Sequence, residues 1–218
     1  MQPRLRRSDL LIRLKNSIFQ NAFVGFVKNL PKIKEKTHRL DKGKLHKDLV
    51  LDEIAATGKP EIYVDMDGVL ADFFGAVAKI HGVKDWKEIR RKHEADVRAA
   101  KIPGFFEKLE PLPHALDLIR GVMHIAGSYS ILSSPLQSEV EKSVDEKSKW
   151  LHNNLRAYPP TEELFSHMKY RYAKQSDGTP NILIDDYPVN IELWEAHGGI
   201  GILYKDEDCQ DVLRKVKA

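Results

Sequence analysis

Residues 61–74 read EIYVDMDGVLADFF, and this stretch decides the fold of the chain. Residues 62–64 are apolar and predict a buried strand, and an acidic turn with Asp65, Asp67 and Asp72 follows directly. Carboxylates one residue apart repel each other and raise each other's pKa. A hard cation would offset this repulsion, and oxygen ligands at this spacing suit Mg²⁺. The stretch therefore predicts a magnesium site at the carboxyl end of a strand.

The chain has 218 residues, of which 42% are apolar and 31% charged. This is enough for one sizeable core, or for a core with a small accessory domain. No apolar run reaches the roughly 18 residues needed to span a bilayer, so we expect no membrane span. The single cysteine, Cys209, excludes an intramolecular disulfide framework. A reducing compartment is therefore favoured, and we expect a cytoplasmic protein.

The first 60 residues are basic, whereas the rest of the chain is acidic. They hold 14 Lys and Arg against 6 Asp and Glu, a net charge of +8, and the remainder holds 21 against 26, a net charge of −5. Apolar residues recur at helical spacing from Leu11 to Ala22 and again from Leu45 to Ile54. The pattern predicts a basic helical extension over residues 1–58, separate from the domain that follows.

Three explanations of this extension remain open. The one we favour is a helical segment packed on the main domain or on a second subunit, which would make the protein a homodimer. The second is a contact with nucleic acid or another anionic surface, since the segment is positively charged. The third is an organellar transit peptide, because the first 30 residues contain arginine and few acids.

From residue 61 onward, strand-like and helix-like stretches alternate. The predicted strands are residues 62–64, 128–133, 164–167, 181–184 and 201–204, and the predicted helices are 72–81, 85–101, 113–123, 138–155, 189–196 and the charged C-terminal stretch. This order indicates an α/β fold, a Rossmann-like parallel sheet with helices on both faces. Ligands bind outside the carboxyl ends of such strands, so residues that end strands should share one rim: Asp65, Ser133, Asp185 and Asp186.

Four patterns occur in a fixed order: DMDGV at residues 65–69, ILSSP at 131–135, a lysine, and ILIDD at 182–186. This order resembles the haloacid dehalogenase-like superfamily of phosphohydrolases. The finer pattern resembles the 5′(3′)-deoxyribonucleotidase family, through DMDGVLADF, GFFEKLEPLPHA, EKSKW and LIDD followed by NIELWEA. The resemblance covers most of residues 60–204. It leaves out the basic extension, so we expect a phosphatase domain over residues 59–218.

The resemblance implies a Mg²⁺-dependent phosphomonoesterase that converts deoxyribonucleoside or ribonucleoside monophosphates to nucleoside and phosphate. Water is a poor nucleophile toward a phosphate dianion, so a carboxylate attacks first and forms an aspartyl-phosphate. Asp65 is the expected nucleophile and Asp67 the expected general acid and base. The expected magnesium ligands are Asp65, the backbone carbonyl of Asp67 and Asp186, with Asp185 as a second or water-mediated ligand.

Hydroxyl and cationic side chains should bind the phosphate. Ser133 and Ser134 are expected to donate to it, and Lys147 matches the family pattern EK-x-x-W. Lys169 fits best as a second cation just before the last acidic strand. Two other lysines remain alternatives: Lys149 and Lys174.

The segment between the first two motifs predicts a small helical cap, at about residues 75–112, that closes over the active site. The resemblance implies that Phe73, Phe105 and Phe106 pack against the nucleobase, a contact that suits aromatic faces. Trp86 and Trp194 are interpreted as core residues.

Two rival functions remain open. The first is a phosphatase for the ends of DNA or RNA strands, held by the basic extension in a salt-dependent way. The second is a non-catalytic binding or assembly protein on the same fold. The intact Asp65, Asp67 and Asp186 argue against the second rival.

Overall fold

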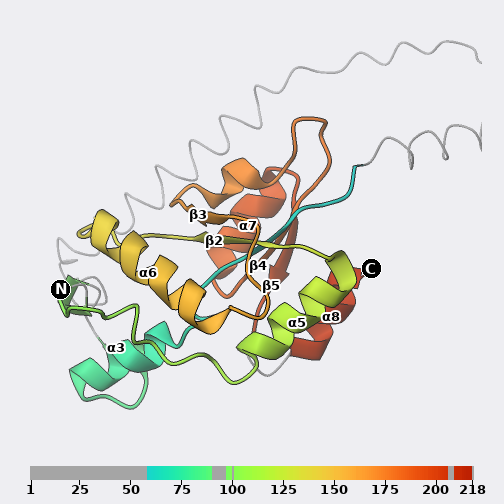
Figure 1. The fold of residues 1–218 in the computed structure, drawn as a ribbon. Helices are drawn as coiled ribbons and strands as arrows, with labels where there is room; N and C mark the ends of the chain where they lie inside the picture. Colours follow the sequence, from blue (N-terminus) through green and yellow to red (C-terminus); the bar gives the residue numbers. More distant parts are fainter. Residues whose placement is uncertain (1–57, 90–96, 100, 206–208, 218) are drawn as a thin grey trace, which may run out of the picture. The chain divides into compact units, whose positions relative to one another are not determined.

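A central parallel sheet organises the computed structural model, which describes residues 58–89, 97–99, 101–205 and 209–217. Five strands lie in the order β3-β2-β1-β4-β5 (Figure 1). They are β1 (Ile62–Val64), β2 (Ser130–Ser133), β3 (Glu163–Phe165), β4 (Ile182–Asp185) and β5 (Ile200–Leu203). All five predicted strands are confirmed. The predictions for residues 1–57 lie outside the described residues.

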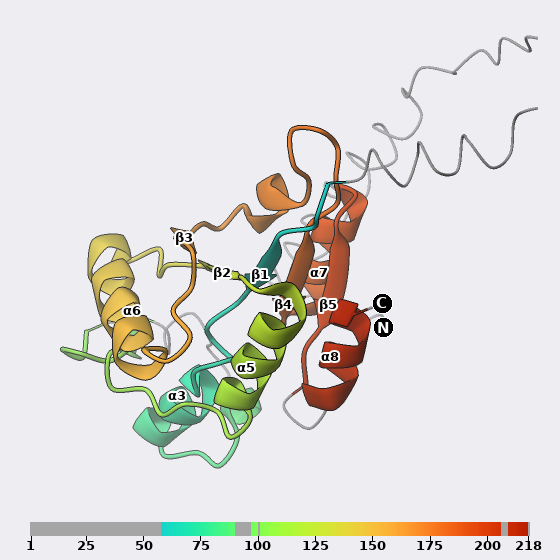
Figure 2. The ribbon, with the colours of Figure 1, turned by 45° about the vertical axis from the view of Figure 1, so that its right-hand side comes forward.

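Helices cover both faces of the sheet, as predicted. They are α3 (Phe73–His81), α5 (Ala115–Ala126), α6 (Val140–Asn154), α7 (Pro188–Ala196) and α8 (Cys209–Lys217), with two short 3-10 helices, η1 (Trp86–Glu88) and η2 (Lys169–Tyr172). Figure 2 shows α5 and α8 side by side on one face of the sheet, with α7 on the other. None of the described helices combines the length and apolar character needed to cross a membrane.

Burial along the central strand shows why both faces are covered. Successive residues of a strand point to opposite faces. Ile62 and Val64 pack in the core cluster that includes residues of α5 and α8, whereas Tyr63 packs with Trp194 of α7. A parallel sheet buried on both faces is the usual result of strand–helix–strand connections.

The predicted helix over residues 85–101 is wrong at its start. Asp85 caps only the single turn η1, where it forms a capping box with Glu88, and Ile89 then takes an extended conformation (φ −73°, ψ 112°). The side chain of Ile89 is buried in the core, so packing outweighs the helical periodicity here. Residues 97–99 are helical, and residues 90–96 lie outside the described part of the chain.

Two backbone stretches, residues 70–72 and 110–112, run side by side where the chain leaves and rejoins the sheet domain. Hydrogen bonds of 2.8 and 2.9 Å join them. We call this pair of stretches the neck. The neck brackets the segment for which a cap is predicted, and the cap boundaries at about residues 75–112 stay a prediction.

Candidate active site

Three carboxylates converge at the carboxyl ends of β1 and β4. Asp65, Asp185 and Asp186 each offer an oxygen, and these oxygens lie within 4.8 Å of one another. The two strands are neighbours at the point where the strand order reverses, which is where ligands bind on sheets of this kind. Oxygen donors at this density fit a hard divalent cation such as Mg²⁺.

The acidic cluster carries a high electrostatic cost in the absence of a metal. Burial raises the pKa of Asp186 to about 8, and the negative charge of Asp65 adds to this effect. Burial and the charge of Asp65 also raise the pKa of Asp185. A divalent cation would remove this penalty, because it stabilises the ionised form of every carboxylate that it contacts.

Gly68 lets the acidic turn approach the third carboxylate. Its φ of +77° favours glycine, and a Cβ at this position would lie 2.5 Å from Oδ2 of Asp186. The turn that follows Asp65 therefore lies directly against the end of β4.

Lys169 joins two of the clustered acids. It lies in η2, is buried, and its Nζ is 2.9 Å from Oδ1 of Asp65 and 2.7 Å from Oδ2 of Asp185. Burial alone would lower the pKa of Lys169, but the charges of Asp65 and Asp185 outweigh it and raise the pKa. The side chain therefore remains a cation inside the protein.

Asp185 and Asp186 differ in what surrounds them. Asn190 donates to both oxygens of Asp185 at 3.1 and 3.0 Å, and the backbone N–H of Tyr187 donates to Oδ1 at 2.9 Å. Together with Lys169, these donors occupy the Asp185 carboxylate. Asp186 instead lines a cavity, and no hydrogen bond from a described residue reaches its carboxylate. Asp186 is therefore the acid that is open to an incoming ligand.

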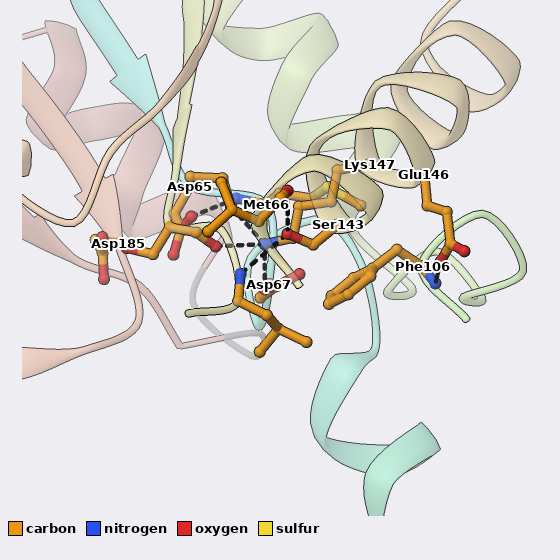
Figure 3. A network of polar contacts seen from close by, with 12 residues as sticks. Asp65, Met66, Asp67, Phe106, Ser143, Glu146, Lys147 and Asp185 are labelled. Carbon is orange, nitrogen blue, oxygen red and sulfur yellow. Dashed lines mark hydrogen bonds and ion pairs between the residues drawn. The ribbon is translucent and has the colours of Figure 1, made fainter. Parts of the chain in front are cut away.

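Lys147 contacts Asp67, the second acid of the turn. It projects from α6 with 0% of its surface exposed, and its Nζ is 2.6 Å from Oδ2 of Asp67 (Figure 3). It also donates to Oγ of Ser133 at 3.1 Å and to the carbonyl of Ser134 at 2.7 Å. One ammonium group thus joins the ends of β1 and β2.

The two carboxylate oxygens of Asp67 differ in their contacts. Oδ2 contacts Lys147, whereas Oδ1 is buried and has no hydrogen-bond partner among the described residues. Burial raises the pKa of Asp67, although Lys147 opposes the shift. A carboxyl group in this state can carry a proton on Oδ1.

The alternative lysines lie away from the carboxylates. Lys149 forms an exposed ion pair with Asp145 at 2.8 Å, and Lys174 is exposed. Of the four candidates, the structure brings Lys147 and Lys169 to the acidic cluster.

A cavity of about 620 Å³ opens beside the acids. The residues that line it include four polar ones, Asp65, Asp67, Ser134 and Asp186, and an apolar group with Phe73, Phe74, Trp86 and Val97. Ser134 also donates from Oγ to the carbonyl of Ser166 at 3.3 Å. Ser133 is buried behind it and does not line the cavity.

Phe105 and Phe106 are not among the residues that line this cavity. Both are buried and lie behind Phe73, with ring centroids 5.9 Å away in each case. Sequence analysis missed Phe74, which adjoins Phe73 in the motif. Trp86 packs against the core, as interpreted, but it also lines the cavity. The Trp86 ring stacks on Phe74 with a centroid distance of 4.6 Å, and no local sequence signal marks this contact.

The parallel sheet, with acids at the carboxyl ends of β1 and β4, agrees with the resemblance to the haloacid dehalogenase-like superfamily that the sequence motifs indicate. A family model described as 5′ nucleotidase, deoxy (Pyrimidine), cytosolic type C protein matches residues 59–215. The chain therefore belongs to this family, and it is a phosphoric monoester hydrolase of the nucleotidase type.

Curated relatives agree with this assignment. A protein of Staphylococcus epidermidis is 28% identical over 153 residues, which cover 63% of this chain and 80% of that protein. One of Bordetella bronchiseptica is 32% identical over 145 residues, which cover 59% and 74%. Both carry the description "Putative 5′(3′)-deoxyribonucleotidase". Among solved structures, a HAD-superfamily hydrolase from Ehrlichia chaffeensis aligns with a TM-score of 0.45 at 15% identity, over 73% of this chain and 97% of that one.

Proposed function

We propose that the protein hydrolyses nucleoside monophosphates to nucleoside and inorganic phosphate, with Mg²⁺ and through an aspartyl-phosphate on Asp65. The observation that carries this proposal is that two buried lysines contact different acids of the turn. Lys169 contacts Asp65, and Lys147 contacts Asp67, so two acids that are one residue apart in one turn have different partners. The printed names of the relatives support a deoxyribonucleotide as the substrate.

Asp65 is oriented for attack by contacts to only one of its oxygens. Lys169 and the backbone N–H of Met66, 2.7 Å away, both contact Oδ1. No hydrogen bond from a described residue reaches Oδ2, so this oxygen attacks phosphorus. The new oxygen–phosphorus bond replaces the bond to the sugar oxygen, and the nucleoside leaves.

Asp67 supplies and recovers the proton. Lys147 holds Oδ2, so the proton sits on the unpartnered Oδ1 and passes to the leaving sugar oxygen. The carboxylate then accepts a proton from the water that attacks the aspartyl-phosphate. Acid–base help of this kind contributes roughly 10²–10⁴-fold to the rate.

Positive charge and a shaped cavity complete the site. Lys147 and Lys169 are buried and do not line the cavity, so they would offset the phosphate charge from beside Asp67 and Asp65, and Ser134, which lines the cavity, would donate to a phosphate oxygen. Mg²⁺ would be held by Asp65, the backbone carbonyl of Asp67 and Asp186, and when bound it neutralises charge and aligns the phosphoryl group. The apolar side of the cavity offers aromatic faces to a nucleobase.

Phosphate release from a panel of deoxyribonucleoside and ribonucleoside 5′- and 3′-monophosphates, with Mg²⁺ or with EDTA, tests the proposal. Asp65→Asn should abolish release, and the exposed Asp117→Asn, which loses only an ion pair with Arg120, should not. The absence of metal-dependent release from every nucleotide would refute the proposal. A 3′-phosphorylated oligonucleotide in the same panel tests the strand-end alternative.

A further inference from the structure

Helix α6 contacts two different parts of the protein with two of its faces. On one face, Ser143 accepts a hydrogen bond from the N–H of Leu136 at 3.0 Å, and Lys147 donates to Ser133, which ends β2, and to Ser134. This face holds the phosphate side of the site. Residues four apart on a helix lie on one face, so Lys142, Glu146 and Trp150 form the other.

This second face binds residues 102–109, which directly precede the second stretch of the neck in the sequence. Lys142 donates to the carbonyl of Ile102 at 3.1 Å, and the indole N–H of Trp150 donates to the carbonyl of Leu109 at 2.7 Å. Glu146 lies between these two anchors. The three side chains therefore hold one segment at successive turns of α6.

Glu146 makes the central contact of the three. The residue is only 6% exposed, and its carboxylate accepts the N–H of Gly104 at 2.8 Å and the N–H of Phe106 at 3.2 Å (Figure 3). Burying a carboxylate is costly unless it is paired or hydrogen-bonded. The adjacent Lys147 points to Asp67 instead, so the two backbone N–H groups and Lys142, at 3.8 Å, compensate the charge.

The anchored Phe106 supports the cavity wall. Its ring stacks on that of Phe73 at 5.9 Å with an interplanar angle of 9°, and Phe73 lines the cavity. Nζ of Lys147 also lies 4.9 Å from the centre of the Phe106 ring, within range of a cation–π contact. A shift of the Phe106 backbone would therefore remove the support behind Phe73.

We infer that Glu146 is a positioning residue that sets the apolar wall of the cavity for the nucleoside part of the substrate; this inference rests on the proposed function. It acts through Phe106 and Phe73 and touches no reacting atom. The hydrogen bonds of Lys147 to Asp67, Ser133 and Ser134 involve neither Glu146 nor Phe106, so we expect the phosphate chemistry to be independent of Glu146.

Glu146→Gln tests the inference, because glutamine keeps one acceptor and places an amide N–H against a backbone N–H. The KM for a deoxyribonucleoside monophosphate should rise about tenfold, because the loss of one hydrogen bond to a charged group changes an equilibrium constant by about that factor. The kcat should stay within about twofold of the wild-type value. The kcat/KM for glycerol 2-phosphate, which has no base, should change less than about twofold. Glu141→Gln, an exposed change on the same helix, is the matched control and should alter neither substrate.

Equal losses on both substrates, or an unchanged KM for the nucleotide, would overturn the inference. Hydrogen exchange of residues 102–109, measured without substrate, should be faster in Glu146→Gln, and unchanged exchange would also overturn it. If Glu146→Gln does not fold, Glu146→Asp keeps the charge, withdraws the carboxylate by one methylene and should show the same rise in KM. If the wild type releases phosphate from glycerol 2-phosphate but from no nucleotide, the proposed function fails, and the exchange result still decides whether Glu146 anchors the segment.

Discussion

The metal-free protein is expected to lose stability as the pH rises from about 4 to 8, because Asp186 must then ionise inside the acidic cluster. Burial and the charge of Asp65 raise the pKa of its carboxyl from 3.8 to about 8. The folded protein thus keeps a proton that the unfolded chain releases above pH 4. This stability is complete below the unfolded pKa and is lost as the pH passes through the folded pKa.

The size of the effect follows from the difference in pKa. At about 1.4 kcal/mol per unit, a difference of about four units gives an upper limit near 6 kcal/mol. Water that reaches the partly exposed carboxyl reduces this limit to about half. The raised pKa values of Asp67 and Asp185 act in the same direction.

Urea unfolding at pH 5, 6, 7 and 8 in EDTA measures this loss, with Asp186→Asn as the comparison. The variant should lack the Asp186 contribution and should be more stable than the wild type at pH 8. Mg²⁺ should reverse the order, and at pH 7 its binding should release about one proton, measurable by calorimetry in two buffers of different ionisation enthalpy. Parallel pH profiles for the two proteins, or Mg²⁺ binding without proton release, would refute the reasoning.

Two further substitutions probe the same cluster. Lys169→Met removes the cation between two buried acids and should cost about 3 kcal/mol of stability in EDTA and abolish phosphate release, whereas the exposed Lys149→Met should cost less than about 1 kcal/mol. Similar losses for the two lysine variants in urea unfolding would contradict this. Gly68→Ala places a methyl group against Asp186 and should weaken Mg²⁺ binding more than about tenfold, since a displaced ligand costs over about 1.4 kcal/mol. Gly127→Ala, at a similar φ of +79° but with no atom within 4 Å, is its control, and equal Mg²⁺ affinity in both would argue against the steric explanation.

The sheet and the convergence of the acids could be predicted from the sequence. Each strand is a short apolar run, and in a parallel sheet the residues that follow such runs meet at one edge. This rule places Asp65 and Asp185 together although 120 positions separate them in the sequence. The α/β fold could be predicted without knowing the exact ends of the helices.

The choice among the lysines and the lining of the cavity depend on packing. Lys147 lies three residues before Trp150 and is buried like it, whereas Lys149 directly precedes Trp150 and points to solvent. The helical phase alone could have favoured Lys147. No such rule applies to Trp86, because its contact with Phe74 depends on the path of the chain after α3.

Because of the neck, the segment between residues 72 and 110 can be replaced as a unit, and we call this segment the cassette. Both of its ends lie within one backbone hydrogen bond of each other, so a replacement needs only termini that are close in space. The acids at the strand ends are outside the cassette, whereas Phe73, Phe74 and Trp86 are inside it. Substrate range can therefore diversify by substitution of this segment while the phosphate chemistry stays fixed on the sheet.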